Sequence, residues 1–212
     1  MKLVCHAHTK YSHDSMLPFW LLHMLCLNKG ITHITITEHN NLKGALAFKE
    51  YCERKGNKLH VILGEEVMTT AGEIIGLYIN EHINSGMSPE ETVAEIKRQG
   101  GIVYVPHPYD EKRYKTVLKE PYIEKLQSQI DCIEVHNGRN ISTDYYIKQN
   151  EIAEKYNLRK VIGGDIHTWI EIGKDYMETD IAPETPETFI AAIESATFTS
   201  SPCIPIAHKF TI

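Results

Sequence analysis

The alternation of short apolar segments with longer helical segments is the feature that most constrains the fold of this chain. The expected strands cover residues 2–6, 31–37, 59–63, 73–79, 102–105, 130–136 and 160–162. The expected helices cover residues 18–30, 42–55, 88–99, 122–127, 143–156 and 186–195. Strands and helices that alternate in this way predict βαβ units and a mainly parallel sheet.

The number of strand units separates two common α/β folds. Seven units are too many for a small flavodoxin-like sheet and favour a barrel. One distortion is expected, because residues 67–79 have the pattern of a hairpin with a turn at Ala71-Gly72. No internal repeat, low-complexity segment or linker divides the sequence. We therefore expect an α/β fold, a distorted (β/α)7 TIM-like barrel, formed by a single domain over residues 1–212.

The composition is that of an ordinary globular protein, with 42% hydrophobic and 24% charged residues. The formal net charge of −6 argues against a surface that coats nucleic acid. The five cysteines include no Cys-x-x-Cys pair and lie mostly in apolar runs, which favours buried thiols in a reducing compartment. The N-terminus has no signal-peptide pattern, and the apolar run 18–27 is too short to span a bilayer. These features predict a cytoplasmic protein with no membrane partner.

Two histidines end the first expected strand. His6 and His8 are two residues apart, so a regular strand directs both side chains to one face, and Asp14 follows on a loop. Such a pair offers two nitrogen ligands to a metal, although a solvated strand end also explains it when it is taken alone.

Other side chains of ligand type follow the later strands. They are His39, Glu66, His107, Glu134, His136, Asp165 and His167. In a parallel α/β barrel the carboxyl ends of the strands open on one face, where active sites lie. Delivery of His and carboxylate groups by several strand ends favours a metal cluster over a set of solvated loop histidines. These donors suit divalent ions such as Zn, Mn or Fe.

Five short motifs together resemble the successive signatures of the PHP (polymerase and histidinol phosphatase) family. They are His6-Ala7-His8-Thr9, Thr37-Glu38-His39-Asn40, Gly64-Glu65-Glu66, Pro106-His107-Pro108 and Gly164-Asp165-Ile166-His167. The resemblance covers nearly the whole chain in the expected order. It implies a distorted (β/α)7 barrel with two or three divalent metal ions, usually Zn, Mn or Fe. Family activities include histidinol-phosphate phosphatase, other phosphoesterases and a 3′–5′ exonuclease linked to DNA polymerases.

The resemblance also implies a ligand set and a mechanism. The first metal would take His6, His8, Glu66 and Asp165; Glu66 would bridge to a second, with His107; and Asp14, His39 and His167 would hold a third. Metals this close can share a hydroxide that attacks phosphorus while they stabilise the phosphoryl oxygens. Asp14, His39 and His167 are the candidate catalytic residues for proton transfer.

The chain departs from the family pattern at three places. Glu38 stands where the family usually has Asp, a mild change at a residue that is not a main ligand, and Val4-Cys5 replaces the usual residues before the first histidine. Ile75 stands where many relatives carry a histidine in the returning strand, which leaves the second metal short of one ligand. His136 could compensate or be a loop histidine.

Several roles stay open between a functional and a structural reading. Glu65 and Glu66 compete as the bridging carboxylate; the family pattern Gly-x-Glu selects Glu66, and Glu65 would then face a helix or solvent. Glu134 either orients a ligand histidine or is a charge at a strand end. Trp20 and Met24, at helical spacing, are expected in the core.

A phosphate substrate needs cations as well as metals. Arg139, in a turn on the expected catalytic face, is the best candidate for a guanidinium clamp. Lys112 and Arg113 lie on a charged connection, residues 109–119, that is expected to be mobile. They either close over the substrate or are ordinary surface charges.

Three functions follow from these patterns. The first is hydrolysis of a small phosphate mono- or diester, so the expected partner is a small phosphorylated substrate. A 3′–5′ nuclease ranks lower, because the chain has no basic stripe, and nucleic acid is then expected only as a substrate. The third is a regulatory or scaffold domain with a degraded cluster. The oligomeric state is not predicted.

Overall fold

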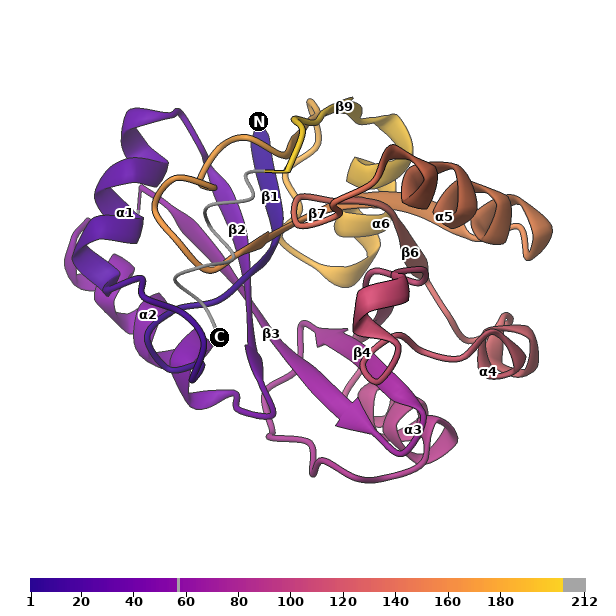
Figure 1. The fold of residues 1–212 in the computed structure, drawn as a ribbon. Coiled ribbons are helices and arrows are strands. Elements are labelled where there is room, and N and C mark those ends of the chain that lie inside the picture. Colours follow the sequence, from indigo (N-terminus) through magenta and orange to yellow (C-terminus); the bar gives the residue numbers. More distant parts are fainter. Residues whose placement is uncertain (57, 204–212) are drawn as a thin grey trace.

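A closed barrel is the centre of the computed structural model, which describes residues 1–56 and 58–203 (Figure 1). Within those residues the strands are β1 (Lys2–Ala7), β2 (His33–His39), β3 (His60–Thr69), β4 (Gly72–Leu77), β5 (Ile102–Val105), β6 (Cys132–Asn137), β7 (Arg159–Ile166), β8 (Tyr176–Glu178) and β9 (Thr197–Thr199). The helices are α1 (Phe19–Asn28), α2 (Lys43–Arg54), α3 (Pro89–Arg98), the 3₁₀ turn η1 (Glu111–Arg113), α4 (Glu120–Leu126), α5 (Thr143–Lys155) and α6 (Pro186–Ser195).

The barrel is formed by seven strands in the order β1 to β7, and pairing between β1 and β2 and between β7 and β1 closes it. All pairs are parallel except β3–β4 and β4–β5. The reversed strand β4 is the expected hairpin. The expected α/β fold, a distorted seven-stranded barrel, is therefore confirmed.

Helix starts agree with the chemistry of their first residues. Ser88 forms a capping box with Glu91 at the start of α3, and the Ser142 hydroxyl accepts a hydrogen bond from the Asp144 N–H at the start of α5. The short strands β8 and β9 were not expected. β8 pairs antiparallel with the first residues of β1, where β7 makes no pair.

The core consists of inward-facing aliphatic side chains and of the helix faces that cover the barrel. Phe48 of α2, Ile96 of α3 and Phe189 of α6 are fully buried. The expectation that Trp20 and Met24 belong to the core is wrong, because 59% and 43% of their surfaces are exposed. The barrel covers only one stripe of α1. Within the described parts of the chain, no helix has the length and apolarity to cross a membrane.

Candidate metal centre

The carboxylate of Glu66, at the end of the parallel part of β3, is the centre of a buried cluster. Its Oε2 atom lies 3.3 Å from His6 Nε2, 3.4 Å from His8 Nε2 and 3.1 Å from His39 Nδ1. Its Oε1 atom lies 3.1 Å from His107 Nε2. Three strand ends, those of β1, β2 and β5, thus bring four imidazoles to one carboxylate, as the barrel geometry predicts.

Two further carboxylates complete the set of eight predicted ligands. Asp165 Oδ1 lies 3.7 Å from both His6 Nε2 and His8 Nε2. Asp14 Oδ2 lies 3.3 Å from His39 Nε2 and 3.1 Å from His167 Nε2. Four groups have ligand atoms within 4.8 Å of one another: His6–His8–Asp165, His6–Glu66–His107, His8–His39–His167 and His39–Glu66–Glu73. The structure therefore brings together every residue predicted as a metal ligand.

Local backbone distortion makes this convergence possible. His6, His107 and Asp165 have positive φ values of 62°, 28° and 47°. At His6 the β1 register shifts against both β2 and β7, and the His6 N–H donates to Thr35 Oγ1 at 2.8 Å. The sequence predicts that regular strand alternation directs His6 and His8 to one face. The structure instead brings the two side chains together through a distortion of the strand at His6. Strain of this kind costs about 1–3 kcal/mol per residue and concentrates at functional sites.

The donor atoms in the cluster fit a metal. His6 Nε2, His8 Nε2, His167 Nε2 and Glu66 Oε2 are buried and have no hydrogen-bond partner among residues 1–56 and 58–203. Buried polar atoms are rarely left without a partner, because their desolvation is then uncompensated. Imidazole nitrogens and carboxylate oxygens that converge on a shared space would be satisfied by divalent cations.

Hydrogen bonds behind the ligands set their tautomers. His6 Nδ1 lies 2.7 Å from Glu134 Oε1, which can only accept, so Nδ1 carries a proton and the neutral imidazole has a bare Nε2. Ser12 Oγ donates to Glu38 and thus accepts from His8 Nδ1 at 3.1 Å, which leaves His8 Nε2 bare as well. Both bare nitrogens face the cluster.

Glu134 is the most connected of these supporting groups. Besides His6 it accepts hydrogen bonds from Tyr104 Oη at 2.6 Å, the His107 N–H at 2.7 Å and Asn137 Nδ2 at 2.8 Å. Its side chain is fully buried. Of the two readings left open by the sequence, the geometry supports orientation of a ligand histidine. Glu38 has a similar place under the loop that carries Asp14, where it accepts from Thr9 and Ser12.

Glu73 belongs to the cluster and was missed by the sequence reasoning. Its carboxylate lies 3.6 Å from His39 Nδ1 and 3.5 Å from His107 Nε2, and it is buried. Ile75, which replaces the expected ligand, pairs with Glu66 across β3 and β4. Glu73 lies two residues earlier on the same face of β4. Two features of the sequence could have identified Glu73 as a ligand: it is two residues from Ile75, and it is the only charged residue of the strand.

Glu65 and His136 lie outside the cluster. Glu65 is fully buried, where it contacts His82 Nδ1 at 2.8 Å and accepts from the Ile83 N–H, so the expectation that it faces a helix or solvent is wrong. A loop covers this outer face of β3. His136 contacts Asp175 at 2.8 Å and stacks on Tyr146, so it does not compensate for Ile75.

The three cationic side chains that are candidates for binding phosphate lie in different environments. Arg113 reaches the cluster, where its Nη1 lies 2.5 Å from Asp165 Oδ2. Its connection was expected to be mobile, but it packs on the β3–β4 turn, with Glu73 N–H donating to the Thr116 carbonyl at 2.7 Å. Lys112 is an exposed surface residue. Arg139 is buried and pairs with Glu171 at 3.0 Å, so its role as a clamp stays a prediction.

The charges of the cluster shift the pKa values of its members. Burial raises the pKa of Glu66, but the His6 and His39 charges outweigh burial and lower it below its ordinary range. Burial lowers the pKa of His39, yet Glu66 and Asp14 raise it to about 11. Burial and the charge of Glu66 raise the pKa of Glu73 to about 7. The cluster without metal therefore holds protons that a cation must displace.

Metal binding is accordingly expected to release protons and to strengthen as the pH rises through neutrality. The raised pKa values of His39 and Glu73 mean that both groups must lose protons before they bind a cation. Calorimetric titration with Mn²⁺ in two buffers of different ionisation enthalpy measures the protons released. The same heat in both buffers at neutral pH would contradict the expectation.

Gly163→Ala is expected to destabilise the fold around Glu134. A Cβ atom at Gly163 would lie 1.9 Å from Glu134 Oε1. We expect a loss of about 1–3 kcal/mol in the free energy of unfolding, measured by urea denaturation. Gly164→Ala is the matched control, because its Cβ would meet the movable side chain of Ile166 at 2.9 Å. Equal losses of unfolding free energy in the two variants would contradict the close packing of Gly163 against Glu134.

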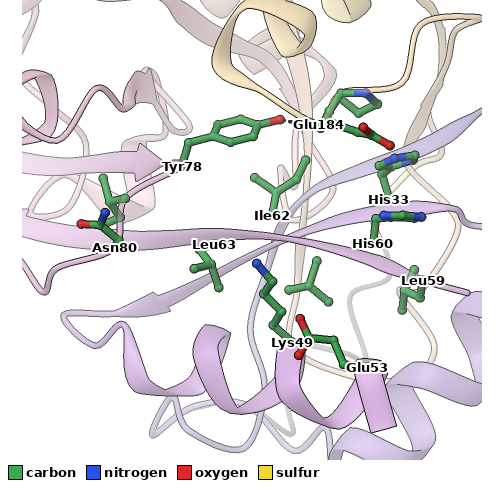
Figure 2. A pocket seen from close by; sticks show the side chains of 13 residues that line it. His33, Lys49, Glu53, Leu59, His60, Ile62, Leu63, Tyr78, Asn80 and Glu184 are labelled. Atoms are coloured by element: carbon green, nitrogen blue, oxygen red, sulfur yellow. Dashed lines mark hydrogen bonds between the residues drawn. The ribbon is translucent and has the colours of Figure 1, made fainter. Parts of the chain in front are cut away.

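A cavity of about 530 Å³ lies elsewhere, between α2, β3 and the segment at Pro183–Glu184 (Figure 2). His33 and His60 line it, and their rings stack 4.9 Å apart. These residues begin β2 and β3, whereas the cluster follows the carboxyl ends of the strands. The cavity is therefore at the opposite end of the barrel, and none of its lining residues belongs to the cluster.

Comparisons with known proteins agree with this fold. A family model described as the PHP domain matches residues 5–180. An uncharacterized protein of Methanocaldococcus jannaschii is 42% identical over 168 residues, which are 70% of this chain and 93% of that protein. The chain belongs to the PHP domain family.

Two solved structures share the fold. One is a two-domain protein from Bacteroides vulgatus that contains a predicted PHP-like metal-dependent phosphoesterase; it has a TM-score of 0.73 and 18% identity. That match covers 94% of this chain, which spans only 64% of the two-domain protein. The other is a candidate metal-dependent phosphoesterase from Bifidobacterium adolescentis, with a TM-score of 0.66, 14% identity and coverage of 92% and 96% of the two chains. At these identities the likeness concerns the fold.

Proposed function

We propose that this chain is a metal-dependent hydrolase that acts on a small phosphate mono- or diester, as one PHP-type domain over residues 1–212. The observation that carries the proposal is the convergence of buried imidazole nitrogens, which have no hydrogen-bond partner among the described residues, on the buried carboxylate of Glu66. Membership of the PHP domain family supports it, as do the descriptions of the two structural neighbours as metal-dependent phosphoesterases.

Two or three divalent cations, Zn, Mn or Fe, would be held by the cluster. The ligands would be His6, His8, Glu66 and Asp165 for one ion; Glu66, His107 and Glu73 for a second; and Asp14, His39 and His167 for a third. When bound, such cations polarise phosphoryl oxygens and acidify water. Glu73 makes up for Ile75, which argues against a degraded cluster with only a regulatory role.

The chain's own residues would bind and orient the substrate. Arg113 holds Asp165 through Nη1 and faces Asp110 through Nε, and its Nη2 can donate to a phosphoryl oxygen. Glu134 and Ser12 keep the imidazoles of His6 and His8 fixed, so little reorganisation is needed during the reaction. Asp14 holds His39 and His167 at the partly exposed rim, where one of the two imidazoles can move a proton to the leaving oxygen when no third ion is bound.

The test is hydrolysis of p-nitrophenyl phosphate and bis(p-nitrophenyl) phosphate by the purified chain with Mn²⁺, Zn²⁺ or Fe²⁺. We expect turnover that requires the metal, that EDTA removes, and that His8→Ala abolishes. His60→Ala is the matched control, because that histidine lies at the opposite barrel end. Fewer than two metals per chain, together with no turnover, would refute the proposal.

Glu73→Gln is expected to weaken one metal site while the others remain filled. The substitution keeps the size of the side chain and removes the charge that faces His39 and His107. We expect the affinity for the weakest-bound ion to fall at least about 10-fold. Metal content per chain after dialysis against graded chelator measures the effect. The exposed Glu50→Gln is the control, and identical metal content in both variants would exclude Glu73 as a ligand.

A further inference from the structure

Glu171 is a buried carboxylate behind the cluster, and it holds the turn that carries His167. Its Oε2 atom accepts hydrogen bonds from the His167 N–H at 2.9 Å, the Thr168 N–H at 2.7 Å and Thr168 Oγ1 at 2.9 Å. The imidazole is fixed as well, because its Nδ1 lies 3.0 Å from the Asp165 carbonyl. Hydrogen bonds to a carboxylate are roughly twice as strong as neutral ones, so this turn has little freedom to move.

The same turn also places Asp14. The His167 carbonyl accepts hydrogen bonds from the Met16 N–H at 3.1 Å and from Ser15 Oγ at 3.1 Å. Ser15 and Met16 directly follow Asp14, whose Oδ2 atom lies 3.1 Å from His167 Nε2. Glu171 therefore acts on two of the three ligands expected for the third ion, namely His167 directly and Asp14 through the loop bound to the His167 carbonyl.

Arg139 holds Glu171 through the other carboxylate oxygen. Its Nε atom lies 3.0 Å from Glu171 Oε1, and both side chains are buried. The Arg139 N–H donates to Asn137 Oδ1 at 3.0 Å, and Asn137 Nδ2 donates to Glu134 Oε2 at 2.8 Å. A continuous set of hydrogen bonds thus joins the turn after β7 to Glu134, the residue that orients the imidazole of the first strand.

Stability alone does not explain a buried ion pair at this place. Desolvation of two charges cancels much of their attraction, and apolar side chains of similar volume often give equal stability. Residues behind metal ligands, in contrast, fix the orientation of those ligands. We propose that Glu171 and Arg139 are positioning residues for the third ion, at the site formed by Asp14, His39 and His167 (the third site). The inference rests on the proposed metal centre, and it gives Arg139 a role other than the expected phosphate clamp.

Glu171→Gln tests the proposal, with chelator competition in solution and anomalous diffraction from crystals grown with Mn²⁺. The amide keeps one acceptor oxygen, and its NH₂ group cannot accept from the turn or from Arg139. We expect the affinity for the third ion to fall about 10–100-fold, and the anomalous peak at the third site to weaken or disappear. The peaks of the other two ions should keep the height that they have in the parent chain.

Asp175→Asn is the matched control. Asp175 is also a buried carboxylate and lies four residues further along the same connection. It contacts His136 Nε2 at 2.8 Å and accepts from the Ser201 N–H at 2.9 Å, and neither partner belongs to the cluster. The control variant should lose stability in urea denaturation and still bind every ion with the affinity of the parent chain.

Arg139→Lys is a milder second variant, because it keeps the positive charge beside Glu171 but not the planar guanidinium. It should weaken the third ion less than Glu171→Gln does, and it decides the question if circular dichroism shows that Glu171→Gln is unfolded. Parent-like affinity for the third ion in every folded variant would overturn the proposal. An equal loss of all ions would overturn it as well, because general destabilisation acts on the whole cluster.

Failure of this inference and failure of the proposed function give different results in the parent chain. Peaks beside His6 and Glu66 with none at the third site would overturn the positioning role and leave the proposed hydrolase intact. The absence of every peak at saturating Mn²⁺ would refute the metal centre itself, and the positioning role with it.

Discussion

Glu66→Gln is expected to remove most of the metal and nearly all of the hydrolytic activity. Both carboxylate oxygens of Glu66 take part in the cluster, since Oε2 faces His6, His8 and His39 while Oε1 faces His107. Glutamine keeps the shape of the side chain but removes its negative charge and one acceptor. Because even residues behind the ligands typically change metal affinity 10–100-fold, we expect turnover to fall more than about 100-fold.

The neighbouring residue offers a close control for this prediction. Glu65 is also fully buried, but it lies on the outer face of β3 against His82 and the Ile83 N–H. Glu65→Gln should keep the metal content and turnover of the parent chain, even if some stability is lost. Metal content per chain, with the rate of phosphoester hydrolysis at saturating Mn²⁺, compares the two variants. Parent-like values for Glu66→Gln would exclude Glu66 as the shared ligand.

Glu134→Ala is expected to have the largest effect on the stability of the chain without metal. The substitution leaves four donors without their acceptor: His6 Nδ1, Tyr104 Oη, the His107 N–H and Asn137 Nδ2. Removing one partner of a buried charged network typically costs about 3–5 kcal/mol. Urea denaturation at pH 7 in the presence of EDTA measures the loss. Tyr104→Phe, which removes one of the four hydrogen bonds, should cost about 1 kcal/mol.

The pH dependence of stability gives the same residue a second test. Burial raises the pKa of Glu134, but the charge of His6 and its hydrogen bond outweigh burial and lower the pKa below the ordinary value. A lowered pKa means that the ionised carboxylate stabilises the folded state above its unfolded pKa of about 4.3. The contribution is lost as the pH falls through the folded value. The unfolding free energy of Glu134→Gln should therefore fall less than that of the parent between pH 5 and pH 3 (roughly the range over which such a carboxyl titrates). Parallel curves would contradict this role.

The barrel could be predicted from the sequence because each strand and helix carries its own local signal. β2 contains the β-branched run from Ile34 to Thr37, β7 contains the apolar pair Val161-Ile162, and Ser88 and Ser142 mark helix starts. The ligand-type residues could be predicted because parallel strands place all their carboxyl ends at one face. The short strands β8 and β9 could not be predicted, because the hydrophobic pattern of three residues does not distinguish a strand from a loop.

What could not be predicted depends on contacts between distant residues. Glu73 reaches His39 and His107 only because β4 runs antiparallel beside β3, and motif spacing does not contain that register. The hydrogen bond from His6 to Glu134 joins residues 128 apart in the chain. Trp20 was placed in the core because apolar character at helical spacing does not tell which side of a helix the barrel covers.

Anomalous diffraction from crystals grown with Mn²⁺ tests the central claim most directly, because it locates each bound ion without reference to activity. We predict one peak within bonding distance of His6 Nε2, His8 Nε2 and the Asp165 carboxylate, and a second beside Glu66, His107 and Glu73. A crystal at saturating Mn²⁺ with no peak among these residues would contradict the assignment of the cluster as a metal centre.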